Sequence, residues 1–164
     1  MVIRRIETKD SQRFLDMLKQ LDNETNDMMF EQGERKTTIE EMQSDIIKMN
    51  ETKSLILIVE DNKKIVGFLS AERGFANRIK HSAYIVIGLL KEYRGKRMGV
   101  KLFAKMEEWA LESDIKRLEL TVMVDNESAI HLYKKMGFKI EGIKEKSLIV
   151  NGKYVDEYYM SKIL

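Results

Sequence analysis

An apolar run over residues 84–90 leads into a basic segment with two glycines, at residues 93–101. Beyond the glycines, Met98, Leu102 and Met106 recur at helical spacing. A strand, a short glycine-bearing loop and a helix in this order aim backbone N–H groups at an anion. The loop is also surrounded by cations, against a single acid at position 92: Lys91, Arg94, Lys96, Arg97 and Lys101. The segment therefore predicts a polyanion-binding loop at the start of a helix.

The same segment resembles the acetyl-CoA-binding motif of the GNAT acetyltransferase family, which has Arg or Gln, two residues, Gly, one residue, then Gly or Ala. Arg94 and Gly99 match this pattern, whereas Arg97 stands where the family has its first Gly. A second block, residues 126–138, resembles the family's helix near the thioester, including its tyrosine (Tyr133) and a closing Gly-Phe. The two blocks occur in family order and at family spacing. The resemblance covers nearly the whole chain and is weakest over roughly the first 50 residues.

The resemblance implies a set of residues that bind acetyl-CoA: Leu89, Leu90, Arg94, Gly95, Lys96, Arg97, Met98, Gly99, Val100, Asn126, Ala129 and Tyr133. Backbone N–H groups of the loop would bind the pyrophosphate, assisted by a helix end that contributes about +0.5 of a charge. The two loop glycines would permit close approach, because a Cβ would block it. At Arg97, either the backbone tolerates the loop geometry or the guanidinium adds a phosphate contact, and we favour the first with a contribution from the second.

The pantetheine arm would lie between the strands ending near residue 90 and spanning residues 117–124, where the resemblance implies that they splay apart. Gly88 is a candidate for a bulge that opens these strands. A close packing contact between layers is the alternative role for this glycine. Small Ala129 would leave room for the arm, and Asn126 matches a residue expected to bond to it.

Tyr133 matches the general acid of the family. Transfer of an acetyl group to an amine passes through a tetrahedral oxyanion and expels a thiolate, which needs a proton. A thiol has a reference pKa of about 8.5 and a phenol one of about 10, so donation from an ordinary tyrosine is unfavourable by about 2 kcal/mol. A site that destabilises the free thiolate can remove this difference. The alternative role for Tyr133 is an ordinary half-buried aromatic side chain on an amphipathic helix.

The sequence indicates the group that deprotonates the amine less clearly than it indicates the general acid. An alkyl ammonium has a pKa of about 10.4, so neutralising it at pH 7 costs about 4.6 kcal/mol. Thr121 stands mid-strand where some family members carry a catalytic glutamate, which makes that route look absent here. Glu72, at the end of a strand, is the best candidate for the base, with a surface carboxylate as the alternative.

An acidic segment lies between the first two expected helices, at residues 22–36. In the family this segment commonly borders the acceptor site. We expect its carboxylates, Glu31 among them, to attract a cationic amine, and Met29 or Phe30 to line the carbon chain of that amine. A solvated loop explains the charges equally well. The last strand offers a second wall for the site with residues Asp156, Glu157, Tyr158 and Tyr159.

Composition excludes several classes of function. Without Cys, neither a disulfide framework nor a thiolate metal site is possible, and His81 and His131 lack metal-ligand spacing. The net charge of +2 is too small to indicate a nucleic-acid binder. No apolar run approaches the ~20 residues of a membrane span, and residues 1–7 carry charges where a signal peptide has its apolar core. We expect a cytoplasmic protein with no metal, nucleic acid or membrane partner.

The hydrophobic pattern of the 164 residues predicts one domain over residues 1–164. It predicts strands over residues 2–7, 55–60, 64–72, 83–90, 117–124, 138–146 and 153–163. It predicts helices over residues 10–21, 38–50, 97–113 and 127–136. The resemblance implies the same architecture, an α/β (α+β) GNAT-type fold with a mixed, mostly antiparallel sheet of about seven strands flanked by about four helices.

These observations favour an acetyl-CoA-dependent N-acetyltransferase whose acceptor is a small amine, an amino acid or a peptide N-terminus. A non-catalytic acetyl-CoA sensor or interaction module is the alternative, motivated by the missing base, although a pure binder has no need of the Tyr133 hydroxyl. A Rossmann or Walker nucleotide site is excluded, because neither glycine pattern is present. Homodimers are common in the family, so a homodimer is possible.

Overall fold

A seven-stranded sheet forms the centre of the molecule, with strands in the order β1-β2-β3-β4-β5-β7-β6. The structure is a computed structural model that describes residues 1–164. The strands are β1 (Val2–Arg5), β2 (Leu55–Asp61), β3 (Lys64–Arg73), β4 (Ser82–Leu89), β5 (Arg117–Met123), β6 (Lys139–Val150) and β7 (Lys153–Ile163). All neighbouring strands are antiparallel except β4 and β5, which are parallel. The expected mixed, mostly antiparallel sheet is confirmed.

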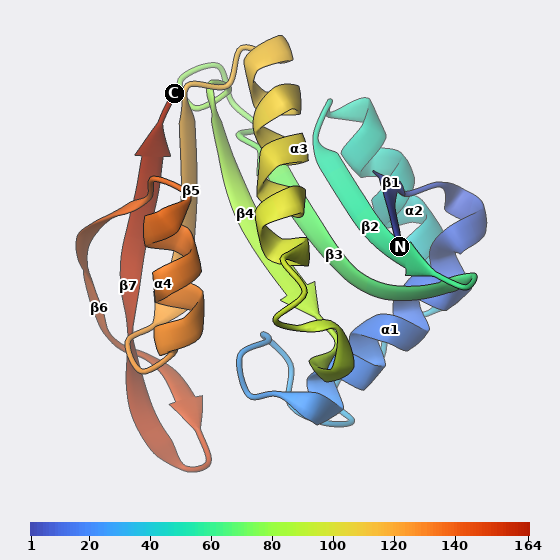
Figure 1. Ribbon diagram of the computed structural model, residues 1–164, viewed down its shortest axis with the longest axis horizontal. Helices are drawn as coiled ribbons and strands as arrows, with labels where there is room; N and C mark the ends of the chain where they lie inside the picture. Colours follow the sequence, from blue (N-terminus) through green and yellow to red (C-terminus); the bar gives the residue numbers. More distant parts are fainter.

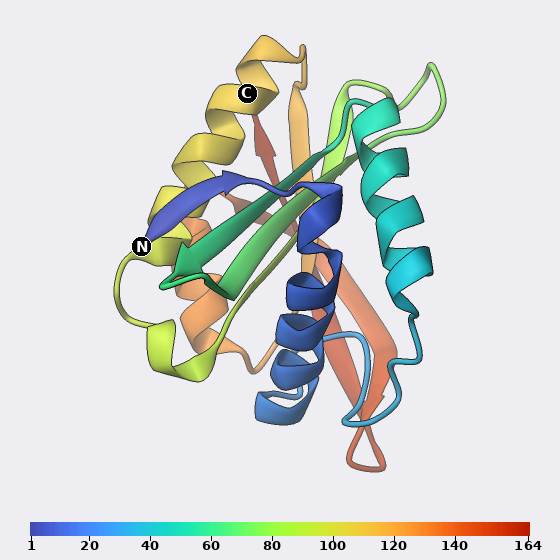
Figure 2. The same ribbon diagram turned by 90° about the vertical axis from the view of Figure 1, so that its right-hand side faces the viewer.

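Four α-helices cover the two faces of this sheet (Figures 1 and 2). They are α1 (Ser11–Glu24), α2 (Ile39–Glu51), α3 (Met98–Glu112) and α4 (Glu127–Lys135). Helices α1 and α2 lie on one face against β1 to β4, whereas α3 and α4 lie on the opposite face. Short 3₁₀ turns precede α1 and α3, at η1 (Thr8–Asp10) and η2 (Lys91–Tyr93). None of the helices combines the length and the apolar character needed to cross a membrane.

Local signals in the sequence account for most element ends. Thr38 caps α2 by accepting a hydrogen bond from the Glu41 N–H at 3.1 Å. Gly137 ends α4 with a φ of +92°, in the left-handed region that favours glycine. Asn151 and Gly152 both have positive φ, which is typical of the tight hairpin turn that joins β6 to β7.

The parallel strands β4 and β5 pair only over their first residues, from Ser82 opposite Arg117 to Tyr84 opposite Glu119. Beyond these pairs the strands diverge, so the backbone groups that face one another across the gap have no strand partner. This is the splay that the family resemblance implies. Its apex is bridged by a hydrogen bond of 2.7 Å between the Tyr84 hydroxyl and Thr121 Oγ1.

Gly88 does not open the splay, and the predicted bulge at this residue is wrong. The register between β3 and β4 is continuous, with Gly88 directly opposite Phe68. A Cβ at Gly88 would lie 2.8 Å from Leu21 Cδ1 and 3.0 Å from Phe68 Cε1. The glycine therefore permits close packing of α1 on the sheet, which is the alternative role that the sequence left open.

A buried ion-pair network joins the start of α1 to β1 and β2. The Asp10 side chain is fully buried, and Arg4 donates to both of its oxygens at 2.8 and 2.9 Å. Arg13 and the Glu7 N–H also donate to this carboxylate. Both arginines bind Glu60 of β2 at 2.9 Å. The hydrogen bonds from Arg4 hold the pKa of Asp10 well below its usual range.

Candidate active site

A loop between η2 and α3 presents a row of unpaired backbone donors. The N–H groups of residues 95–100 donate to no acceptor in the protein. Gly95 and Arg97 both adopt left-handed backbone, with φ of +74° and +62°. The Arg94 side chain donates from Nε to the Leu89 carbonyl at 3.0 Å, which ties the loop to the end of β4. Successive free N–H groups at a helix start form an anion-binding concavity.

Arg97 adopts this left-handed conformation although it is not glycine. The conformation costs an L-residue roughly 1–2 kcal/mol, which explains why the family motif has Gly at this position. The Arg97 guanidinium makes no hydrogen bond or ion pair within the protein, and the residue lines a neighbouring cavity. The backbone thus tolerates the loop geometry, and the side chain remains free to contact an anion.

The neighbouring cavity has a volume of ≈ 1070 Å³, and its lining residues come from both faces of the sheet. It brings together most of the predicted site residues, namely Met29, Phe30, Glu72, Leu89, Arg94, Gly95, Arg97, Met98, Gly99, Val100, Asn126, Ala129 and Tyr133. The cavity therefore connects the anion-binding loop on the α3 side with the acidic segment on the α1 side.

Three predicted residues lie outside this cavity. Leu90 is 1% exposed and belongs to the hydrophobic core, where its N–H donates to the Val66 carbonyl. The Lys96 ammonium lies over the Tyr93 ring, 4.9 Å from its centroid. Glu31 is exposed and does not contribute to the lining. We leave these three residues out of the proposed site.

Gly99 has a packing role as well as a place in the cavity. A Cβ on this residue would lie 2.9 Å from Leu132 Cδ2, so glycine allows α3 and α4 to approach one another. Gly95 has open space around its Cβ position, and its left-handed φ is what requires glycine. The two loop glycines therefore serve different purposes.

Tyr133 projects from α4 into the cavity and is 8% exposed. Its ring packs edge-on against Phe103 at 5.8 Å and tilted against Phe138 at 6.2 Å. Its hydroxyl makes no hydrogen bond within the protein. Burial, with smaller contributions from Asp27 and Tyr84, raises the pKa of Tyr133 well above its ordinary value of 10. Tyr133 is therefore protonated at physiological pH and cannot act there as a base, and its raised pKa widens the gap to the thiol that donation must overcome.

Asn126 is both the cap of α4 and a free donor. Its Oδ1 accepts a hydrogen bond from the Ala129 N–H at 3.3 Å. The amide nitrogen of Asn126 has no protein partner and remains available to a ligand in the cavity. Capping therefore orients the side chain that the family resemblance assigns to the pantetheine arm.

The acidic segment between α1 and α2 is held in place by one of its own carboxylates. Asp22 is buried and binds Arg35 through two hydrogen bonds of 2.7 and 3.1 Å. The same guanidinium lies over the Phe30 ring at 4.7 Å. The contacts of Arg35 with Asp22 and Phe30 hold Phe30 at the cavity. Asp27 also lines the cavity.

Glu72, the predicted base, is exposed, lines the cavity and lies directly opposite Tyr84 in the sheet. Two further carboxylates, Asp27 and Glu157, share this cavity. Both residues carry a signal in the sequence: Asp27 lies in the acidic segment, and Glu157 lies in the last strand, which is expected to offer a second wall of the site. Their place in one cavity with Glu72 could not be obtained from local pattern.

Comparison with known proteins identifies this arrangement. A model of the acetyltransferase (GNAT) family matches residues 15–138, which include the anion-binding loop, α3, β5 and α4. The chain belongs to the GNAT acetyltransferase family. Its match to the family covers both sequence blocks that carry the resemblance.

Individual relatives agree in function and in fold. An L-amino acid N-acetyltransferase, AaaT, from Escherichia coli is 37% identical over 115 residues, which cover 68% of each chain. The crystal structure of a GNAT acetyltransferase from Streptococcus pneumoniae is 32% identical and superposes with a TM-score of 0.95 over 99% of each chain. The structure of yncA from Salmonella typhimurium with acetyl-CoA shares the fold, with a TM-score of 0.89, 16% identity and coverage of 100% of this chain and 94% of that one. The chain is therefore an N-acetyltransferase of the GNAT family, and nothing in the comparisons favours a non-catalytic sensor.

Proposed function

We propose that this GNAT enzyme transfers an acetyl group directly from acetyl-CoA to a primary amine carried by a small molecule, an amino acid or a peptide N-terminus. The observation that carries this proposal is the continuity of the cavity. The anion-binding loop, Tyr133 and four carboxylates all line it, and these carboxylates are Asp27, Asp45, Glu72 and Glu157. Such a cavity can admit two substrates from opposite faces of the sheet.

The cavity fits acetyl-CoA in charge and in shape. The free N–H groups of residues 95–100, with the guanidinium of Arg97, suit the pyrophosphate. The unpaired edges of β4 and β5, together with the amide nitrogen of Asn126, suit the amide groups of the pantetheine arm. Acetyl-CoA supplies the acetyl group as a thioester.

The residues around the thioester position divide the proton transfers between them. Tyr133 is protonated, unbonded and buried, so its hydroxyl donates to the sulfur that leaves as CoA. The acceptor amine must lose a proton before or during attack, and Glu72 is the base that we propose for this step. Both groups line one cavity, so both proton transfers can take place around one bound thioester.

The activity is tested by measuring CoA release from acetyl-CoA against a panel of polyamines, free amino acids and short peptides. We expect amine-dependent release, with formation of the acetylated amine confirmed by mass spectrometry. Tight binding of acetyl-CoA with no turnover across the panel would contradict the proposed reaction. Failure to bind acetyl-CoA would contradict the assignment of the anion-binding loop.

Arg97→Gly separates the backbone of the loop from its side chain. Glycine adopts the left-handed φ of this position without strain, so the loop is retained and Tm is expected to be unchanged or higher. The guanidinium is lost, and we expect the Kd for acetyl-CoA to rise about 10-fold, measured by isothermal titration calorimetry.

Two control variants accompany this measurement. Arg97→Ala removes the same guanidinium but keeps the left-handed strain, so it should weaken binding similarly and be less stable than Arg97→Gly. Lys96→Ala removes a neighbouring cation that lies over Tyr93 outside the cavity, and its effect on Kd should be much smaller. Wild-type affinity in Arg97→Gly would show that the side chain makes no phosphate contact.

A further inference from the structure

Glu157 is a largely buried residue whose carboxylate lines the cavity and has no partner in the protein. It projects from β7 into the cavity, is 9% exposed, and makes no hydrogen bond or ion pair. Lys144 lies opposite Glu157 in the sheet register, but its ammonium lies over the Tyr159 ring at 5.9 Å. Its oxygens are not sealed from solvent, since Ser161 Oγ is the only fully buried side-chain polar atom without a partner. A cationic ligand in the cavity can therefore pair with the Glu157 carboxylate.

A second carboxylate contributes negative charge to the same space. Asp27 lines the cavity from the segment between α1 and α2, and it lies close enough to Tyr133 to help raise the pKa of that hydroxyl. Within the protein, Asp27 accepts a hydrogen bond only from the Thr25 hydroxyl, at 2.8 Å. The two walls of the acceptor side, β7 and the α1–α2 segment, thus each present a carboxylate without a cationic partner.

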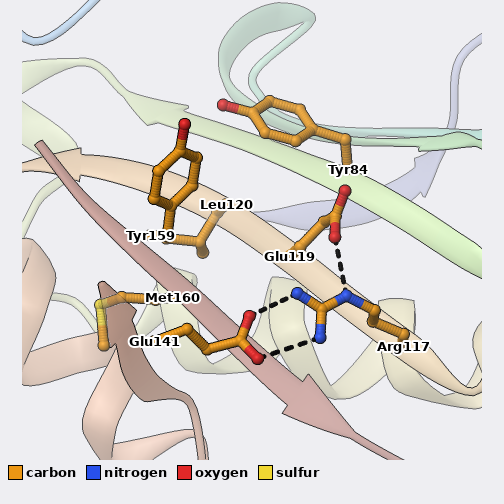
Figure 3. Close-up of a pocket in the computed structure, with 7 residues that line it drawn as sticks. All are labelled: Tyr84, Arg117, Glu119, Leu120, Glu141, Tyr159 and Met160. Carbon is orange, nitrogen blue, oxygen red and sulfur yellow. Dashed lines mark hydrogen bonds and ion pairs between the residues drawn. The ribbon is translucent and has the colours of Figure 1, made fainter. Parts of the chain in front are cut away.

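The arginines on this side are already engaged and cannot neutralise these carboxylates. Arg35 binds Asp22, and Arg73 donates to the carbonyls of Lys80 and Ser113. Figure 3 shows Arg117 held between Glu119 and Glu141, in a smaller pocket that shares Tyr84 with the main cavity. Lys48 is exposed on α2, and Asp45 precedes it by three residues on the same helix. The acceptor side therefore favours a cation.

We propose that Glu157 and Asp27 bind a second positive charge of the acceptor, which is therefore a diamine or polyamine. This inference rests on the transferase activity proposed above and names its acceptor class. The reacting nitrogen must be neutral to attack, and a carboxylate beside it would retain its proton. A second ammonium keeps its charge throughout the reaction, and Met28, Met29 and Leu148 give its methylene chain an apolar wall.

Free amino acids are the competing class of acceptor, because the Escherichia coli relative is named for them. An amino acid brings its own carboxylate within two bonds of the reacting nitrogen. That carboxylate would require a free cation, whereas Arg35 and Arg73 are bound to other groups and the free guanidinium of Arg97 belongs to the anion-binding loop. Repulsion by Asp27 and Glu157 would also weaken its binding.

The test compares cadaverine with pentylamine, which has the same carbon chain and one amine. For the wild type we expect cadaverine and spermidine to have a kcat/KM at least about 10-fold above those of pentylamine and methionine. Glu157→Gln should raise the KM for cadaverine about 10- to 100-fold with little change for pentylamine. Glu145→Gln is the control, because it removes an equal charge from an exposed position on β6 outside the cavity.

Stability gives a second readout that does not depend on turnover. Glu157→Gln removes a charge that has no partner in the protein, so without ligand its Tm should be unchanged or slightly higher. Cadaverine should raise the Tm of the wild type and leave that of the variant unchanged. A structural role for Glu157, such as an ion pair with Lys144, would instead lower the Tm of the variant.

The outcomes separate the two proposals. A wild type that acetylates methionine better than cadaverine, or a Glu157→Gln variant with unchanged cadaverine KM and lower Tm, would overturn the diamine assignment while leaving the transferase intact. A wild type that acetylates no amine would contradict the proposed reaction. In that case a rise in the Tm of the wild type with cadaverine would still support the cation site at Glu157. No rise would overturn it.

Discussion

Tyr133→Phe is expected to lower kcat by about 10²–10⁴-fold, the range typical for loss of a general acid. The hydroxyl is the only group removed, and it makes no hydrogen bond within the protein. The ring remains packed against Phe103 and Phe138, so the fold should be retained. The Kd for acetyl-CoA should change little, because the loss concerns the transfer step. Single-turnover kinetics with saturating acetyl-CoA measure this effect.

The pH profile provides the control for this assignment. Because burial raises the pKa of Tyr133 above 10, the acid remains protonated across the accessible range. The wild-type rate should therefore rise with pH as the amine loses its proton, without an alkaline decrease below about pH 10. Full activity in Tyr133→Phe, or a wild-type profile that falls between pH 8 and 9, would remove Tyr133 from the role of acid.

Asp10→Ala is expected to destabilise the protein by about 1–3 kcal/mol, because it removes the buried acceptor of a hydrogen-bond network whose arginines are partly exposed. The variant leaves the guanidinium groups of Arg4 and Arg13, and the Glu7 N–H, without their shared acceptor. Because these groups join the start of α1 to β1 and β2, the effect should be global. Urea denaturation followed by circular dichroism measures the free energy of unfolding.

Asp16→Ala is the matched control on the same helix, since Asp16 is exposed and accepts only from Gln12. Its effect should be within about 0.5 kcal/mol. The pKa of Asp10 is lowered by folding, so its contribution is present above the unfolded value of about 3.9 and is lost as pH falls below it. The difference in stability between wild type and Asp10→Ala should therefore narrow in acid. A constant difference down to pH 2 would contradict this account.

Much of the architecture could be predicted because it depends on local chemistry. The order of the eleven expected elements follows from apolar periodicity and from caps such as Thr38 and Asn126, which act within one helical turn. The anion-binding loop was equally visible, because glycine, cations and a helix start within ten residues are sufficient to build it. Tyr133 was found by resemblance, and its local spacing placed it on the same helix face as Ala129.

Contacts between segments that lie far apart in the sequence could not be predicted from local pattern. The role of Gly88 depends on Leu21 from α1 and Phe68 from β3, so its sequence context suggested a bulge where the structure has close packing. Leu90 is in the apolar run that the motif includes, yet its side chain belongs to the core. The splay itself arises because β4 and β5 share only a short register near their starts.

The charged side chains show most clearly the difference between what local sequence predicts and what packing determines. The sequence shows that Glu157 is acidic and that it shares one face of its strand with Tyr159, because the period of a strand is two residues. Whether such a carboxylate has a partner depends on where Arg35, Lys144 and Arg117 send their side chains, and these positions are set by Asp22, Tyr159 and Glu141. Hydrogen bonds and ion pairs act over a few ångströms in space, so the local pattern predicts which groups are present, and packing determines which of them remain free.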